Sequence, residues 1–346
     1  MPASVPDISS APNFADFRFP QEPFAALLRD LGWPDQSHWV QTWRDRGGAA
    51  LAPEAWRSAP NMDWIWGLAL PLLSEVERLA ADPRPRIVGL SAGIGTGKST
   101  LCRWLKAAAA EIGVQIDVVS LDDFYLPSPA LEASLQGNPW GVCRGLPGCH
   151  DTELMLQCLK DWRQGRDVSV PVFDKTLRNG RGDRAGSRPL RGSLLVVEGW
   201  LLGVPPPTPW DCSGSDQDTN RAATALSEAL GAGMVQELSP AEVDYQAKAQ
   251  QQLRAYGPIW KQIDRLWRID ATDLRASALW KAQQHSFTLT KPEADQFVRA
   301  LVVSLPANIW ERIESDVLAT IDPLRTVHWI GLRPPQPQGD AGPTPA

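Results

Sequence analysis

The spacing of apolar residues predicts helices in the first part of the chain. Between residues 24 and 43 apolar positions recur at helical spacing, with a break at Gly32-Trp33-Pro34. A second helical pattern covers residues 62–79 and ends before Pro83-Arg84-Pro85. We therefore expect residues 1–82 to form a helical extension that packs on the rest of the chain.

From residue 83 onward, short apolar runs alternate with helical patterns, which is typical of an α/β fold with a parallel sheet. We expect one main domain over residues 83–332, followed by a disordered tail at 333–346. Residues 203–245 begin with a proline-rich stretch and show no strong periodicity, so they resemble a variable insertion. The predicted strands are residues 87–90, 115–121, 168–173, 194–197, 267–271 and 326–330. The predicted later helices are residues 151–162, 243–266, 274–287 and 293–314.

A glycine-rich segment separates the first predicted strand from the helix that follows. Residues 92–99, Ala-Gly-Ile-Gly-Thr-Gly-Lys-Ser, fit the P-loop pattern, in which glycines let several backbone N–H groups point at a phosphate. Lys98 would reach the β and γ phosphates, and Ser99 would ligate Mg²⁺. An ordinary glycine turn is the alternative, which the strand–turn–helix setting disfavours. The residues expected to bind nucleotide are Gly93, Ile94, Gly95, Thr96, Gly97, Lys98, Ser99 and Thr100.

Acidic residues follow two of the predicted strands. Asp122 and Asp123 come after the second strand, and Glu198 ends the strand at 194–197. The carboxyl ends of parallel strands face the ligand crevice, so one Asp could accept the proton of an acceptor hydroxyl. Glu198 stands where a Walker B acid would hold Mg²⁺ through water. The alternative for the Asp pair is a structural role in a turn.

Two loops combine glycines with cations. Residues 137–151 carry Arg144, His150 and Asp151. Arg144 could bind a substrate carboxylate or be a surface charge, and Asp151 could simply cap the next helix. Residues 174–184 form either a solvated charged hairpin or an anion site, and their cations are Lys175, Arg178, Arg181 and Arg184.

Composition narrows the class of partner. The net charge is −6 over 346 residues, which leaves no basic footprint for nucleic acid. No window is long and apolar enough to span a membrane, and the N-terminus lacks a signal-peptide pattern. The five cysteines form no C-x-x-C pair, as expected for free thiols in a reducing compartment. We expect a cytoplasmic protein with a small-molecule substrate.

Several motifs, taken together over about residues 62–330, resemble D-glycerate 3-kinase of the plant and cyanobacterial type. They are the P-loop, Ser-Leu-Asp-Asp-Phe-Tyr-Leu at 120–126, Asn138-Pro139, Arg144-Gly145-x-x-Gly148-x-His150-Asp151, Phe173-Asp174-Lys175, Gly180-Arg181-Gly182-Asp183-Arg184, Val197-Glu198-Gly199-Trp200, Leu253-x-x-Tyr256-x-x-x-Trp260, Trp280-x-x-Gln283 and Phe297-Val298-x-x-Leu301. This family belongs to the P-loop kinases with phosphoribulokinase, uridine kinase and pantothenate kinase. The resemblance implies a three-layer αβα sandwich with a mostly parallel sheet and a helical N-terminal extension.

The resemblance also implies a reaction: ATP and Mg²⁺ would serve to phosphorylate D-glycerate to 3-phosphoglycerate, in photorespiratory salvage. Asp122 would be the catalytic base, helped by Lys98. The expected substrate-binding residues are Asp122, Tyr125, Arg144, His150, Asp151, Lys175, Arg181 and Arg184. Lys281 and His285 depart from the family's Arg and Glu, which weakens the expectation of a lid cation at residue 281. The alternatives are a kinase for uridine, pantothenate or ribulose 5-phosphate, and an ATP-dependent switch protein without a small-molecule acceptor.

Overall fold

A six-stranded sheet forms the centre of the molecule. The computed structural model describes residues 12, 14, 17–56, 60–206, 238–273, 276, 280, 291–305 and 307–333. The strand order is β2-β5-β1-β6-β7-β8, in which β8 is antiparallel to β7 and the other neighbours are parallel. The strands are β1 (Arg86–Ala92), β2 (Ile116–Ser120), β5 (Leu194–Gly199), β6 (Arg265–Ala271), β7 (Val317–Ile321) and β8 (Val327–Leu332).

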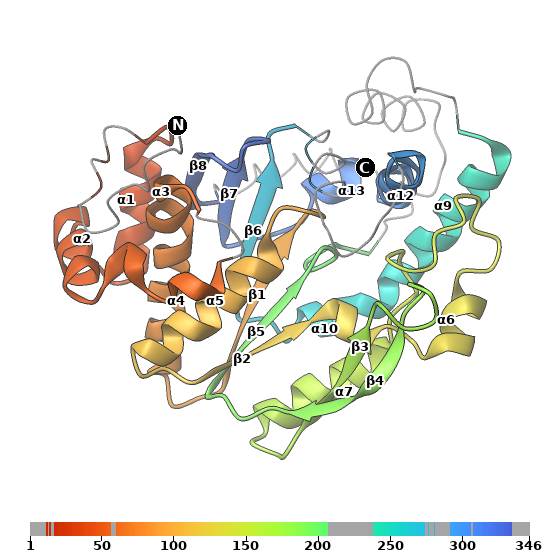
Figure 1. Ribbon diagram of the computed structural model, residues 1–346, viewed down its shortest axis with the longest axis horizontal. Helices are drawn as coiled ribbons and strands as arrows, with labels where there is room; N and C mark the ends of the chain where they lie inside the picture. Colours follow the sequence, from red (N-terminus) through yellow and green to blue (C-terminus); the bar gives the residue numbers. More distant parts are fainter. Residues whose placement is uncertain are drawn as a thin grey trace, which may run out of the picture.

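Helices cover both faces of this sheet (Figure 1). Successive residues of a strand point to opposite faces, so Val88 joins one hydrophobic core and Ile87 the other. The first core includes α4 (Leu70–Ala80) and α5 (Lys98–Glu111). The second includes α7 (Thr152–Arg163), α9 (Pro240–Gln252), α10 (Gly257–Trp260), α12 (Lys291–Ser304) and α13 (Ala307–Glu311). The predicted three-layer α/β fold is confirmed.

The helices predicted near the N-terminus are present. They are α1 (Gln21–Asp30), α2 (Gln36–Asp45), the 3-10 turns Gly48–Ala50 and Pro53–Ala55, and α3 (Met62–Trp64), which continues through a π turn, Ile65–Ala69, into α4. Trp39 and Trp43 of α2 both donate hydrogen bonds to the Ser74 hydroxyl of α4, at 3.0 and 2.9 Å. Asp63 accepts a bond from the amide of Val327, which ties α3 to β8. These contacts anchor the N-terminal helices to one another and to the sheet.

A separate antiparallel hairpin lies beyond the sheet edge formed by β2. It consists of β3 (Ser169–Asp174) and β4 (Asp183–Pro189), and it lies near α6 (Ser128–Ser134) and α7 in Figure 1. Residues 175–182 thus form the connection of this hairpin, and the choice between a solvated hairpin and an anion site stays a prediction. Between β2 and α6, a 3-10 turn, Leu121–Phe124, carries the predicted acidic pair.

Two predictions near the C-terminus are wrong. The helix predicted over 293–314 is two helices, α12 and α13, with Pro306 between them in the sequence, and β7 was not predicted. The helix predicted over 243–266 overruns β6, because β6 already pairs with β1 from Arg265 and Leu266 onward. Short apolar segments such as β7 are ambiguous without their sheet neighbours.

Some predictions fall outside the described residues. They concern most of the 203–245 insertion, Cys212, most of the 274–287 helix, Lys281, His285 and the tail after residue 333. Among the described cysteines, Cys102, Cys143, Cys149 and Cys158 are free thiols, as expected. None of the helices in the described ranges combines the length and apolar character that a membrane span requires.

Candidate active site

The predicted P-loop connects β1 to α5 and forms a cradle of backbone N–H groups. Gly95 and Gly97 have φ values of 77° and 105°, which favour glycine, whereas Gly93 is not among the positive-φ glycines. Within the described part of the chain, the N–H groups of residues 95–99 donate no hydrogen bond. Because α5 begins at Lys98, its N-terminal dipole adds positive potential to these amides. This arrangement is suited to binding phosphate.

Arg325, in the turn between β7 and β8, donates hydrogen bonds to the backbone of the P-loop. Its guanidinium donates to the carbonyl oxygens of Gly95 and Thr96 at 3.0 and 3.3 Å, and it lies 5.2 Å from the ring centroid of Trp280. In a trans peptide the C=O and the following N–H point in opposite directions, so these bonds turn the N–H groups of Thr96 and Gly97 away from Arg325. Arg325 is not among the residues that the sequence predicts for the site. The missed strand β7 explains this, since its carboxyl end places the turn at the ligand edge.

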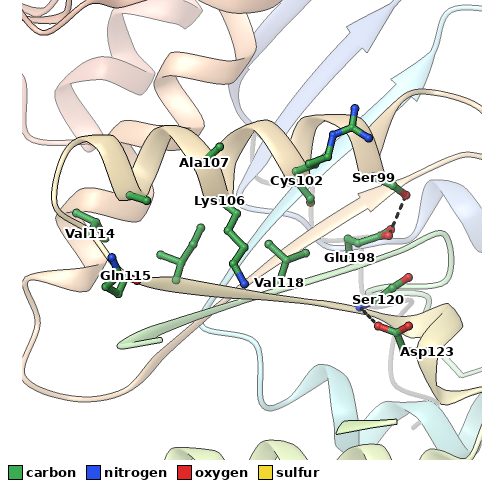
Figure 2. Close-up of a pocket in the computed structure, with 13 residues that line it drawn as sticks. Ser99, Cys102, Lys106, Ala107, Val114, Gln115, Val118, Ser120, Asp123 and Glu198 are labelled. Carbon is green, nitrogen blue, oxygen red and sulfur yellow. Dashed lines mark hydrogen bonds between the residues drawn. The ribbon is translucent and has the colours of Figure 1, made fainter. Parts of the chain in front are cut away.

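The two residues predicted to hold Mg²⁺ lie together. The Ser99 hydroxyl donates to Oε1 of Glu198 at 3.0 Å, and Figure 2 shows Ser99 on α5 facing Glu198 on β5. No three His, Cys, Asp or Glu side chains cluster in the described ranges, but Mg²⁺ is commonly held by one or two protein oxygens, with waters and substrate phosphates completing its shell. A hydroxyl and a buried carboxylate beside the cradle fit that chemistry.

A groove of about 600 Å³ begins at this pair and extends between α5 and β2 (Figure 2). Ser120 and Asp123 line the same end, and Val114 and Gln115 line the other. The residues predicted to bind the acceptor do not line this groove. The groove therefore shares Ser99 and Glu198 with the predicted metal site and shares no lining residue with the predicted acceptor site.

Asp122 is paired with Lys175 of the hairpin. The Lys175 Nζ lies 2.5 Å from Oδ2 of Asp122. Burial alone would raise the pKa of Asp122, but the Lys175 ammonium, and more weakly Lys98 and His150, lower it well below its ordinary value. The structure thus brings the predicted base, the P-loop lysine and one hairpin cation within electrostatic reach of one another.

His150 is buried in an aromatic layer. Its ring stacks on Tyr125 at a centroid distance of 4.6 Å, and its Nδ1 lies 2.7 Å from the hydroxyl of Tyr256. Burial lowers the pKa of His150 to about 4, so the ring is neutral at pH 7. The sequence assigns no separate role to Tyr256, which comes from the 3-10 turn Leu253–Tyr256 more than a hundred residues away.

Asp151 and Arg184 link the loop to the hairpin. Asp151 caps α7 by accepting the amide of Leu154, and its other carboxylate oxygen accepts from Arg184 at 2.8 Å. Arg184 also donates to the carbonyl oxygen of Tyr125. Asp151 therefore has the structural role considered from the sequence, and it also orients a predicted substrate cation.

The other two predicted cations have different surroundings. Arg144 is buried, and it donates to the carbonyl oxygens of Gly180 and Arg181 at 2.7 and 2.9 Å, which fastens the loop to the hairpin turn. The Arg181 guanidinium is 63% exposed and pairs with Glu132 of α6. The structure therefore groups Asp122, Tyr125, His150, Asp151, Lys175 and Arg184 closely, while the Arg181 side chain extends toward α6.

Comparison with known proteins finds kinases among the relatives of the chain. No family model matches it. An uncharacterized kinase of Schizosaccharomyces pombe, mug58, is 28% identical over 214 residues, which cover 59% of this chain and 71% of that protein. The chloroplastic D-glycerate 3-kinase of Arabidopsis thaliana is 34% identical over 137 residues, but the match covers only 36% of this chain and 30% of that enzyme.

Among solved structures, D-glycerate 3-kinase from Cryptococcus neoformans matches with a TM-score of 0.59 and 23% identity, over 77% of this chain and 97% of that one. At this identity the match establishes the fold, which is that of the P-loop kinases. The chain is thus a homologue of small-molecule P-loop kinases, and its relatives include D-glycerate 3-kinases.

Proposed function

We propose that the chain is an ATP-dependent kinase that phosphorylates the 3-hydroxyl of D-glycerate and yields 3-phosphoglycerate and ADP, the closing reaction of photorespiratory salvage. The observation that carries this proposal is the Asp122–Lys175 pair, which stands within electrostatic reach of the P-loop residue Lys98. A carboxylate next to a phosphate cradle supplies a base, and the adjacent cations suit an acidic acceptor.

The nucleotide phosphates would be held by the cradle. The N–H groups of residues 95–99 and the Lys98 ammonium would bind the transferring phosphate, with Arg325 keeping the loop in place. Ser99 and Glu198 would hold Mg²⁺, which neutralises charge on the phosphate oxygens. Transfer would be direct and in line, so the contribution of the protein is positioning and charge stabilisation.

Asp122 would accept the proton of the 3-hydroxyl. In the structure its carboxylate is occupied by Lys175, which makes it a weak base. An anionic acceptor or the transferring phosphate would draw the Lys175 ammonium toward itself and thereby raise the basicity of Asp122. The ion pair would then couple activation of the base to arrival of the substrates.

The carboxylate of D-glycerate would be bound near Arg184 and His150. Arg184 already has one carboxylate partner, Asp151, which holds its guanidinium in a fixed orientation. Tyr125 packs between His150 and the hairpin residue Phe173, so its ring would form one side of the acceptor site. A nucleoside acceptor would need an aromatic side chain on which its base could stack, in place of a cation such as Arg184.

The test is ADP release by the purified protein with ATP and Mg²⁺, with D-glycerate, L-glycerate, uridine, pantothenate and ribulose 5-phosphate as separate acceptors. Stimulation by D-glycerate alone, with 3-phosphoglycerate as product, is the expected result. Stimulation by a different acceptor would refute D-glycerate and retain the kinase chemistry. Slow hydrolysis that no acceptor stimulates would favour an ATP-dependent switch protein. The Lys98→Ala variant is the background control.

A further inference from the structure

The hydroxyl of Tyr256 makes two polar contacts at once. It accepts a hydrogen bond from the amide of Gly148 at 3.0 Å, and it lies 2.7 Å from His150 Nδ1. The Tyr256 side chain is fully buried, so water does not compete for these positions. Each partner therefore has to be matched to a donor or acceptor of the protein.

These contacts determine where the imidazole proton lies. A phenolic hydroxyl can accept hydrogen bonds and has one proton to donate, whereas a backbone amide can only donate to it. Among the contacts of the described residues, Nδ1 is therefore the one acceptor for the buried Tyr256 proton, which would otherwise be left unsatisfied. The hydroxyl donates to Nδ1, so Nδ1 accepts and the proton of the neutral ring is on Nε2. The hydrogen-bond network around an imidazole ring assigns its tautomer in this way.

We propose that Tyr256 is a positioning residue that holds His150 as a neutral Nε2–H donor for an anionic oxygen of the acceptor. This inference rests on the proposed kinase function, and it assigns a role in acceptor binding to a residue outside both the P-loop and the Asp122–Asp123 pair.

The surroundings of Nε2 support this role. Nε2 is buried and has no hydrogen-bond partner among the described residues, while the whole side chain of His150 is 4% exposed. A buried donor without a partner is unfavourable, and an acceptor atom of a ligand would relieve this cost. Asp122 and Lys175 are the charged groups that act on the ring.

Neutrality matters because of the neighbouring cation. A charged imidazolium would repel Lys175, which is paired with the proposed base. A neutral N–H can bind a carboxylate oxygen and leave the Asp122–Lys175 pair undisturbed. The chemistry selected at this position is therefore an acceptor-only oxygen, such as that of a carboxylate, and a donor such as an amide or ring N–H is disfavoured.

The primary test measures the tautomer directly, by nitrogen-15 NMR of histidine-labelled protein at pH 7. The chain has four histidines, and the His150→Gln variant identifies the signals of His150. We expect Nε2 to be protonated and Nδ1 to be unprotonated in the wild-type protein. Protonation of Nδ1, or of both nitrogens, would overturn the proposal, and this measurement needs no variant of Tyr256.

The second test separates positioning from folding. Tyr256→Phe removes the hydroxyl that donates to Nδ1, so we expect a mixture of tautomers, a KM for D-glycerate raised about tenfold and an unchanged KM for ATP. Tyr245→Phe removes a hydroxyl from another buried tyrosine, on α9, and should change neither the tautomer nor either KM. An unchanged tautomer in Tyr256→Phe would refute the inference.

The outcome is distinguishable from failure of the proposed function. If the expected tautomer is found but another acid is the acceptor, only D-glycerate is refuted, and the KM comparison is repeated with that acid. If D-glycerate is phosphorylated but its addition to the ADP-bound protein leaves the Nε2 signal unmoved, the proposed contact is refuted while the kinase activity stands.

Discussion

The ammonium group of Lys175 lies 2.5 Å from Oδ2 of Asp122, so the proposed base and a cation of the hairpin form an ion pair in the structure. The pair joins the turn that follows β2 to the end of β3. Because the cation lowers the pKa of Asp122, the carboxylate is ionised at neutral pH but weakly basic. Activity should therefore depend on both members of the pair, in different ways.

Asp122→Asn should lower turnover by at least about a hundredfold, because the variant loses the general base. The KM for ATP should stay within about twofold, since the cradle is formed by other residues. The matched control is Asp123→Asn: its carboxylate accepts from the amide of Ser120 in the same turn, so its loss should lower thermal stability more than turnover. Near-normal turnover in Asp122→Asn would remove this residue from the role of base.

Lys175→Met should move the acidic limb of the pH dependence of kcat/KM to higher pH. Loss of the ammonium removes the interaction that lowers the pKa of Asp122, and burial then raises it. Activity at pH 7 should also fall, because an anionic substrate loses a cation. An unshifted acidic limb, measured from pH 4 to pH 8 with stable protein, would mean that Asp122 is not the group that titrates.

Arg184 and Arg181 lie three residues apart on the hairpin but should behave differently. Arg184 is 24% exposed and bonded to Asp151 and the Tyr125 carbonyl, so Arg184→Ala should raise the KM for the acceptor at least about tenfold. Arg181 is 63% exposed and pairs with Glu132, so Arg181→Ala should change that KM by less than about threefold. A larger effect in Arg181→Ala would show that this side chain turns inward when substrate binds.

Arg325→Ala should weaken nucleotide binding and leave acceptor binding unchanged. Its guanidinium holds two P-loop carbonyls, and loss of charge-assisted bonds of this kind costs about 1.5–3 kcal/mol, or roughly tenfold or more in the KM for ATP. Arg18→Ala is the control, because Arg18 pairs with Asp322 in the same β7–β8 turn and is largely exposed. Equal effects of the two variants would assign Arg325 to the stability of the turn alone.

Sequence patterns predict the parts of this molecule that depend on local chemistry. The P-loop is one continuous segment. Ser99 lies just after β1 and Glu198 lies near the end of β5, so their contact follows once β1 and β5 are placed side by side in a parallel sheet. The alternation of strands and helices likewise defines the α/β class, and the helices near the N-terminus follow from their apolar spacing.

Contacts between distant segments are not predictable in this way. Tyr256 lies 106 residues from His150, and Arg325 lies 230 residues from Gly95. The motif that contains Tyr256 carries no chemical signature that would pair it with His150, and Arg325 belongs to none of the motifs named above. The exposure of Arg181 is also invisible in the sequence, because Arg181 and Arg184 are both cations of the same glycine-containing hairpin, and only tertiary packing decides which side chain meets Asp151.

The burial of His150 predicts a pH dependence of folding stability. Burial lowers its pKa to about 4 from 6.5, so the unfolded chain binds this proton at a higher pH than the folded protein does. The stabilisation is complete above pH 6.5 and is lost progressively as the pH falls toward 4. The difference corresponds to about 3 kcal/mol in the free energy of unfolding.

Urea unfolding of the wild-type protein and of His150→Gln, at pH 7 and at pH 4.5, measures this contribution. The stability of the wild-type protein should fall between these pH values by about 2 to 3 kcal/mol more than that of the variant, since Gln cannot titrate. A comparison of the two proteins removes the effects of all other titrating groups. If the difference in stability between the two proteins does not change with pH, the ring of His150 is accessible to protons in the folded state, and it cannot be the neutral buried donor on which acceptor binding is proposed to depend.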